Sequence, residues 1–165
     1  MAHIAILGLG NWGTAVARMW LLDGHKVKGW TIEQEVYESI TMDQINKKYL
    51  PEHSVEGLEV TMHINEALEG VEIVVLAVPS SVILDVMDDV LPHLRPGPGK
   101  RLISEAINTK LKEANMNNPL AVVTGPTIAP EAASGVMTTA LVASEDESVA
   151  EKLAETLTTQ TFILH

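Results

Sequence analysis

The chain contains no cysteine, few aromatic residues and half as many basic as acidic side chains. Its 165 residues include 11 Lys and Arg against 22 Asp and Glu, a formal net charge of −11, and aromatic residues make up 4%. The absence of cysteine excludes disulfides, thiolate catalysis and cysteine-ligated zinc. Nucleic-acid surfaces need clustered Lys and Arg, so this acidic composition also argues against a nucleic-acid partner.

Long apolar runs and paired histidines are missing as well. The longest apolar stretches, such as residues 71–78, are strand-sized, so we expect no membrane span. The first residues show no basic and then apolar signal pattern, and we expect a cytoplasmic protein. No two histidines have metal-ligand spacing, so no metal site is predicted; the six are His3, His25, His53, His63, His93 and His165.

The composition and the patterning of the chain suit one folded domain of the α/β class. The chain is 46% hydrophobic, and its length predicts one domain over residues 1–165. Strand patterns alternate with helix patterns, which predicts a doubly wound, mainly parallel sheet. The predicted strands are 4–7, 26–30, 58–62, 71–78, 120–124, 138–143 and 161–164; the predicted helices are 15–22, 33–46, 65–69, 82–91, 100–114, 129–134 and 145–158.

Four local signals refine this layout. Gly24 follows the first helix and predicts a left-handed helix stop. The strand over 71–78 is apolar at almost every residue, as expected for a parallel strand that is buried on both faces. Ser144 and Glu147 predict a capping box at the last helix. Residues 95–99, Arg-Pro-Gly-Pro-Gly, indicate a break in regular structure.

The most informative motif joins the first strand to the first helix. It reads Gly8-Leu9-Gly10-Asn11-Trp12-Gly13. Gly8 allows a tight turn, Gly10 lets the backbone approach a pyrophosphate without a Cβ, and Gly13 lets helix and strand pack closely. The helix start then offers free N–H groups to phosphates. This pattern in this context predicts a Rossmann-like dinucleotide site; the alternative is a glycine-rich turn that holds no ligand.

The second strand end bears on which dinucleotide would bind. An acidic residue about 20 positions after such a motif often takes the ribose hydroxyls, whereas an arginine favours the 2′-phosphate of NADP. Glu33 lies 20 residues after Gly13, and residues 30–35 contain no arginine. NAD is therefore favoured, with NADP possible. The alternative is that Glu33 only starts the next helix.

Other candidate residues follow from the expected topology. Ligands on such sheets bind at the carboxyl ends of the strands. Pro79, the first residue of a strand-to-helix turn, and the segment 125–127 lie at two of these ends. We expect them to face one crevice together with the glycine turn and residues 30–33.

Four motifs in order resemble one family. They are Trp-Gly-Thr-Ala at 12–15, Tyr-Leu-Pro at 49–51, Ala-Val-Pro-Ser at 77–80 and Gly-Pro-Thr-x-Ala-x-Glu at 125–131. Together they resemble the NAD(P)-dependent glycerol-3-phosphate dehydrogenases, over the N-terminal half of that family. The resemblance implies an oxidoreductase of glycerophospholipid metabolism. In the complete enzyme, hydride would pass between sn-glycerol 3-phosphate and the nicotinamide, giving dihydroxyacetone phosphate.

The resemblance also implies residue roles. Asn11 and Trp12 would line the diphosphate, Ala129 would touch the cofactor, and Gly125 and Thr127 would face the substrate's end. Trp12 has an alternative role, in packing over the sheet edge. Pro126 and Thr127 have one as well, as no more than a strand-to-helix cap.

Two departures from the family make catalysis by this chain doubtful. The family's Lys-Gly-Ile segment, whose lysine assists proton removal from the substrate hydroxyl, is not found. A forced alignment puts Glu105 in the lysine's place, while a better one leaves the strand missing between about 97 and 100. Lys100 or Lys110 could substitute, although both are expected on a solvated helix face. The family's C-terminal helical domain, with a further lysine and a phosphate clamp, has no counterpart.

Several interpretations of the function therefore stay open. We expect a chain that is inactive alone and meets a small phosphorylated substrate only when a second domain is supplied. An alternative is a non-catalytic dinucleotide-binding or interaction module that has lost the lysine strand. A different two-domain dehydrogenase, of ketopantoate or 6-phosphogluconate type, is disfavoured by residues 49–51 and 125–127. A missing domain would expose apolar surface, so a homo-oligomer is possible.

Overall fold

The chain packs as two compact units. The computed structural model describes residues 1–79, 81–93 and 103–165. The first unit comprises residues 1–78, 127–138 and 159–162, and the second comprises 79–126, 139–158 and 163–165. The extent of one domain over 1–165 stays a prediction.

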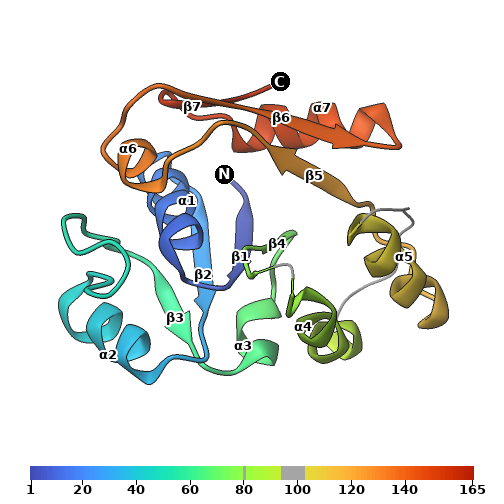
Figure 1. The fold of residues 1–165 in the computed structure, drawn as a ribbon, viewed down its shortest axis with the longest axis horizontal. Coiled ribbons are helices and arrows are strands. Elements are labelled where there is room, and N and C mark those ends of the chain that lie inside the picture. Colours follow the sequence, from blue (N-terminus) through green and yellow to red (C-terminus); the bar gives the residue numbers. More distant parts are fainter. Residues whose placement is uncertain (80, 94–102) are drawn as a thin grey trace. The chain divides into compact units, whose positions relative to one another are not determined.

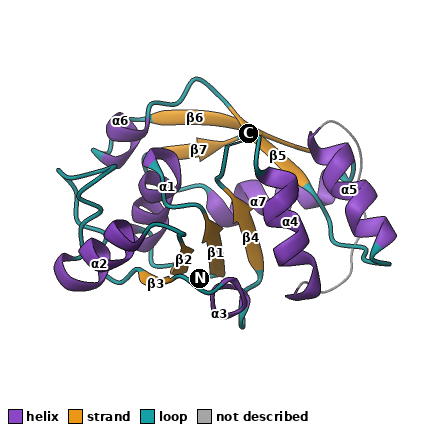
Figure 2. Ribbon diagram, turned by 60° about the horizontal axis from the view of Figure 1, so that its bottom comes forward, coloured by secondary structure: helices purple, strands orange, loops and turns teal. Residues whose placement is uncertain are grey.

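The first unit is built on a parallel four-stranded sheet. Its strands run in the order β3-β2-β1-β4, and each neighbouring pair is parallel (Figure 1). Helices follow the first three strands along the chain, which confirms the predicted α/β class (Figure 2). The elements are β1 (His3–Leu7), α1 (Asn11–Leu22), β2 (Lys26–Trp30), α2 (Gln34–Asp43), β3 (Glu59–Thr61), α3 (Ile64–Leu68), β4 (Ile73–Leu76) and α6 (Ala129–Ala133).

This strand order places a topological switch point beside β1. The chain moves from β1 through β2 to β3 on one side and then returns to add β4 on the other side of β1. In such sheets the crevice for a ligand lies at the carboxyl ends of the strands where the order reverses. Here those ends are Leu7 of β1 and Leu76 of β4, which are paired in register.

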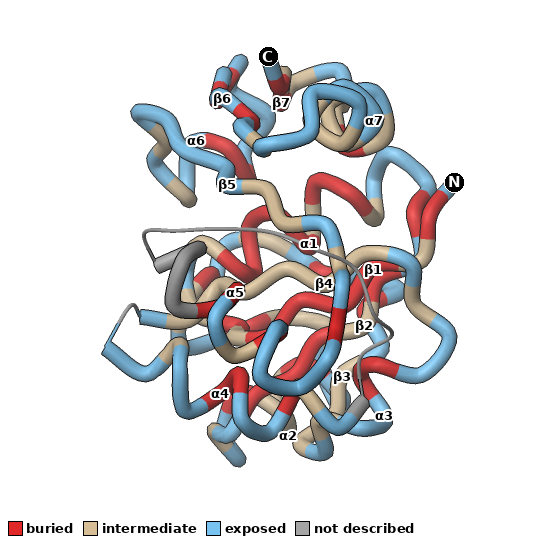
Figure 3. Tube along the Cα trace, turned by 90° about the vertical axis from the view of Figure 1, so that its right-hand side faces the viewer, coloured by how far each residue is buried: buried red, intermediate tan, exposed pale blue. Residues whose placement is uncertain are grey.

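The buried core explains why β1 and α1 form where they do. Four of the five residues of β1 are buried, as are seven of α1, and Figure 3 shows both elements largely in the buried colour. The helix ends as predicted: Gly24 has φ +84°, its N–H donates to Leu21 O, and the N–H of His25 donates to Trp20 O. These two bonds form the Schellman motif.

One prediction about the sheet was wrong. The strand over 71–78 was expected to be buried on both faces, but β4 is only half-buried at each of its four residues. In the described part of the chain β4 pairs with β1 on one side and stands at the edge of its sheet, so its other side lacks a strand that would cover it.

The second unit carries most of a smaller sheet. Its strands run in the order β5-β6-β7, and β5 pairs with β6 in the antiparallel sense, which the strand and helix alternation did not indicate. The elements are α4 (Ile83–Val90), the 3-10 turn η1 (Leu91–His93), α5 (Ile103–Glu113), β5 (Ala121–Thr124), β6 (Thr138–Ser144), α7 (Glu147–Leu157) and β7 (Phe162–Leu164). The predicted helix over 100–114 is present from 103 to 113; residues 100–102 and the predicted break at 95–99 lie outside the described residues.

The predicted capping box at the last helix was also wrong. Helix α7 begins at Glu147, and its N-cap is Asp146, whose Oδ1 accepts the N–H of Ser148 at 3.0 Å. Ser144 is the last residue of β6, and its hydroxyl donates to Leu120 O at 2.9 Å. Ser144 therefore ties the two strands together rather than capping the helix.

The helices of the structure are short or polar. Among the described residues, none of them combines the length and apolar character needed to cross a bilayer.

The glycines of the turn allow a matched test of packing. An ideal Cβ at position 13 would lie 1.9 Å from Gly8 O, whereas one at position 10 would meet nothing within 4 Å. We expect Gly13→Ala to lower the free energy of unfolding by about 3 kcal/mol or more, because the helix must shift off the strand end. Gly10→Ala should cost less than about 1 kcal/mol. Urea denaturation of both variants measures this, and equal losses would contradict it.

Candidate functional site

The glycine turn lies at the switch point, and its conformation requires Gly8. This residue has φ +106°, and its N–H donates to Trp30 O at 3.0 Å. An ideal Cβ there would lie 2.7 Å from Ala77 O and 2.8 Å from Val78 Cγ1, just beyond β4. A side chain is therefore excluded both by the left-handed backbone and by the close approach of the neighbouring strand end.

Gly10 leaves the start of α1 open. It is the N-cap residue and provides no side-chain hydrogen bond to the first turn, while its carbonyl accepts the N–H of Thr14 at 3.0 Å. Asn11 is exposed at the first helical position. Because the space at Gly10 is empty and the helix start is uncapped, backbone N–H groups and the positive end of the helix dipole are available to an anion. The cradle fits a dinucleotide diphosphate.

The middle residue of the turn anchors it from below. Leu9 is buried, and an ideal Cβ at Gly29 of β2 would lie 2.8 Å from Leu9 Cδ1, so this glycine makes room for the leucine. The carbonyl oxygen of Leu9 accepts two side-chain hydrogen bonds, from Thr14 Oγ1 at 3.1 Å and from Asn46 Nδ2 at 2.9 Å. The turn is thus held both by packing and by hydrogen bonds.

Asn46 is a positioning residue that the sequence predictions missed. Its exposed fraction is 0%, its Nδ2 also donates to Thr14 Oγ1 at 2.8 Å, and its Oδ1 accepts the N–H of Tyr49 at 3.2 Å. One amide therefore connects the glycine turn, the first helix and the Tyr-Leu-Pro segment. The only signal in the sequence was an asparagine three residues before that segment.

Glu33 does start the next helix, but its carboxylate points elsewhere. It is the N-cap of α2 without a side-chain cap bond, and its N–H donates to Thr31 Oγ1 at 3.2 Å. Lys48 Nζ donates to Glu33 Oε2 at 2.5 Å, and Tyr49 Oη donates to Glu33 Oε1 at 2.8 Å. Glu33 therefore starts the helix, as the alternative had it, and its side chain also belongs to a cluster with Lys48 and Tyr49.

The cluster has definite electrostatics. The hydrogen bond from Lys48 and then that from Tyr49 lower the pKa of Glu33 below its ordinary value. Lys48 also pairs with Glu35, and its bonds to Glu33 and Glu35 raise the pKa of its ammonium group. The bond to Glu33 raises the pKa of Tyr49. These directions favour a charged Glu33, a charged Lys48 and a neutral Tyr49 hydroxyl that donates its hydrogen bond at neutral pH.

Trp12 and Ala129 have packing roles in the first unit. The Trp12 ring lies edge-on to Phe162, with 6.0 Å between ring centroids and an interplanar angle of 72°. Trp12 remains half-buried, so part of its side chain is accessible beside the uncapped helix start. Ala129 packs against the buried cluster of Ala15, Leu50 and Ala133. Contacts of Trp12 and Ala129 with a cofactor stay predictions.

The remaining candidate residues at strand ends are Pro79, Gly125 and Thr127. Pro79 is exposed, and its carbonyl accepts the N–H of Val82 at 3.0 Å. Gly125 is exposed, and an ideal Cβ there would lie 2.9 Å from Ala140 Cα, so the approach of β6 requires glycine whatever binds. The N-cap of α6 is Ile128, so the alternative of Thr127 as the cap was wrong. The convergence of all four ends on one crevice stays a prediction.

Three residues were candidates for the place of the family lysine. Glu105 and Lys110 lie on α5, and Lys100 lies outside the residues that the structure describes. Lys110 Nζ forms an ion pair with Asp88 of α4, so its charge is engaged. The backbone of Glu105 is in α5, and its side chain and Lys100 lie outside the described residues. Over the described ranges no three His, Asp or Glu side chains are grouped to hold a metal ion.

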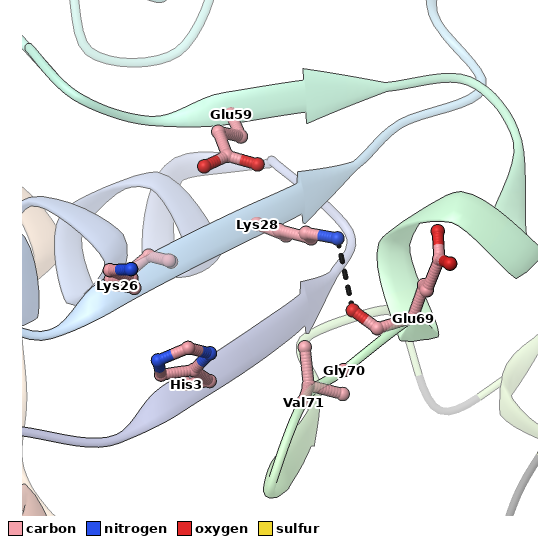
Figure 4. A pocket seen from close by; sticks show the side chains of 8 residues that line it. His3, Lys26, Lys28, Glu59, Glu69, Gly70 and Val71 are labelled. Atoms are coloured by element: carbon pink, nitrogen blue, oxygen red, sulfur yellow. Dashed lines mark hydrogen bonds between the residues drawn. The ribbon is translucent and has the colours of Figure 1, made fainter.

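A small hollow lies at the amino ends of the parallel strands, opposite the glycine turn. It is lined by residues that begin or precede strands, among them His3, Lys26, Glu59 and Val71, and it holds about 200 Å³ (Figure 4). Lys28 Nζ donates to Glu69 O at 3.0 Å there. The hollow is at the amino ends of the strands and is smaller than about 300 Å³, a usual lower bound for ligand pockets, so it is not the candidate dinucleotide site.

Comparison with known proteins decides the family. Residues 3–150 match the model of the NAD-dependent glycerol-3-phosphate dehydrogenase N-terminus. The chain belongs to this family. It is 34% identical to a glycerol-3-phosphate dehydrogenase [NAD(P)+] of Halothermothrix orenii over 97% of this chain and 49% of that protein. It is 36% identical to the protein of the same name of Rhodospirillum rubrum, over 97% of this chain and 48% of that one.

A solved structure agrees with this membership. The crystal structure of glycerol-3-phosphate dehydrogenase from Coxiella burnetii matches 99% of this chain and 53% of that chain, with a TM-score of 0.87 and 31% identity. The chain thus spans about half the length of the relatives it matches. The Rossmann-like fold class is confirmed, and the cofactor class that goes with this family is NAD or NADP.

The buried amide at position 46 gives a test of how the turn is held. We expect Asn46→Asp to lower the free energy of unfolding by about 2 kcal/mol or more, because a carboxylate has no N–H for Leu9 O or Thr14 Oγ1. Asn65→Asp, at an exposed position of α3, should change it by less than about 0.5 kcal/mol. Urea denaturation compares the two, and similar stabilities would contradict the role given to Asn46.

Proposed function

We propose that this chain is the cofactor-binding half of a glycerol-3-phosphate dehydrogenase and binds NAD(H) in preference to NADP(H). The observation that supports this most directly is the uncapped start of α1 behind Gly10, at the switch point beside β1, in a member of this family. Backbone N–H groups at such a position are the usual partners of a pyrophosphate.

The proposed roles follow the geometry of each residue. Gly8 and Gly13 shape the turn, Gly10 gives the diphosphate room, and the exposed Asn11 and half-buried Trp12 border it. Glu33 accepts hydrogen bonds from the hydroxyls of the adenine ribose. Each of its two oxygens already accepts one hydrogen bond and keeps a lone pair for a further donor. The residues proposed to border the cofactor's other end are Pro79 and Ala129, and those at the substrate's end are Gly125 and Thr127.

The reaction proposed for the complete enzyme is hydride transfer between C2 of sn-glycerol 3-phosphate and the nicotinamide, giving dihydroxyacetone phosphate. When bound, the cofactor supplies or accepts the hydride. This chain's own residues hold and orient the dinucleotide. Since the family's lysine segment is not found and these 165 residues span about half the length of the relatives, we propose that this segment alone does not turn over this substrate.

A second candidate function rests on the missing Lys-Gly-Ile segment. Without that lysine, no assigned group assists removal of the hydroxyl proton, and Glu105 would bring the opposite charge. On this account the chain is a dinucleotide-binding module without catalysis. The cytoplasmic location and the homo-oligomer stay predictions under both candidates.

Calorimetric titration with NADH tests the proposal. We expect saturable binding of NADH by the 165-residue chain and at least tenfold weaker binding by Gly10→Ala, because the added Cβ fills the space for the diphosphate. Denaturation of the same Gly10→Ala sample shows that it is folded. No binding at millimolar NADH, or equal binding by both proteins, would contradict the proposal.

An activity arm separates the two candidates. NADH formation from glycerol 3-phosphate and NAD is measured with the chain alone and with the C-terminal half of the Coxiella burnetii relative fused to it. No activity alone and activity in the fusion supports the dehydrogenase half. No activity in a fusion that binds NADH supports the non-catalytic module, and activity of the chain alone contradicts both.

A further inference from the structure

The cluster of Glu33, Glu35, Lys48 and Tyr49 at the end of β2 contains one cation, the Lys48 ammonium group. Residues 30–35 contain no Lys or Arg, so the segment directly after β2 has no positive charge of its own. Lys48 reaches it from the loop after α2, with Nζ 2.5 Å from Glu33 Oε2 and in an ion pair with Glu35 as well. Its side chain is 40% exposed, so it is accessible to a ligand.

We propose that Lys48 determines how far this site discriminates between NAD and NADP. The inference rests on the proposed function, in which Glu33 faces the adenine ribose. A group at the ribose 2′ position that contacts Glu33 would lie beside Lys48 Nζ, because this nitrogen is bonded to the same carboxylate.

The charges around that position set the preference. Glu33, Glu35 and Lys48 sum to a formal charge of −1, so a doubly charged 2′-phosphate is repelled and a 2′-hydroxyl is accepted. Without Lys48 the sum is −2, and the repulsion of the phosphate increases while the neutral hydroxyl is little affected. Lys48 therefore lessens a preference for NAD that the two carboxylates create.

Local contacts keep Lys48 in this place. Its Nζ lies 5.5 Å from the centroid of the Tyr49 ring, and Tyr49 itself donates to Glu33. The buried Asn46 accepts the N–H of Tyr49 and so fixes the start of the segment. The ammonium group is thus held by two carboxylates and an aromatic face rather than by one exposed ion pair.

The adjacent Lys47 offers a matched control. It pairs with Asp43 of α2 at 2.6 Å, and its side chain is 62% exposed. Lys47→Met removes the same charge from the chain as Lys48→Met, one residue away. A general effect of net charge on dinucleotide binding would appear in both variants, whereas an effect at the ribose would appear only at Lys48.

The experiment measures dissociation constants of NADH and NADPH by calorimetry at low salt, for the chain and its variants. We expect Lys48→Met to raise the ratio of the NADPH constant to the NADH constant about tenfold. Lys47→Met and Lys48→Arg should leave the ratio within about twofold. Glu33→Gln should lower the ratio, because it removes a negative charge from the same position.

The outcomes are distinguishable. A merely structural role for Lys48 would weaken both dinucleotides equally and leave the ratio unchanged, which would overturn this proposal while NADH binding still supported the proposed function. Equal ratios for Lys47→Met and Lys48→Met would overturn it too. If the unmodified chain bound neither dinucleotide, the proposed function and this inference would both fail.

Discussion

The contact between Gly8 and Gly13 is the constraint on which the rest of the candidate site depends. The carbonyl oxygen of Gly8 occupies the place where a side chain at position 13 would begin. Helix α1 therefore starts directly against the end of β1, and its first N–H groups emerge at the edge of the sheet where the strand order reverses. This contact fixes where the helix begins, and so where its uncapped N–H groups would meet the proposed diphosphate.

One segment of the chain supports two parts of this arrangement. Asn46 holds the carbonyl of Leu9 within the turn, and Lys48 and Tyr49 hold the carboxylate of Glu33 after β2. The residues proposed to meet the diphosphate and those proposed to meet the ribose are thus positioned from the same loop. A change in this loop would alter both together, which is a reason to treat residues 46–49 as part of the site.

The sequence predicted the elements and the turn well because their signals are local. The strand, the spaced glycines and the helix lie within 20 consecutive residues, and the left-handed stop at Gly24 is encoded at one position. Contacts over longer separations were missed. Asn46 meets Leu9 across 37 residues, and Trp12 meets Phe162 near the other end of the chain. The half-burial of β4 depends on its neighbours rather than on its own composition.

The proposed dinucleotide site lies at the start of α1. A titration of ¹⁵N-labelled chain with NAD, followed by amide chemical shifts, tests it most directly. We expect the largest shifts at Gly10, Asn11 and Trp12, because their N–H groups would meet the diphosphate. Shifts confined to the opposite edge of the sheet, near Lys26 and Gly70, or no shifts at millimolar NAD, would contradict it.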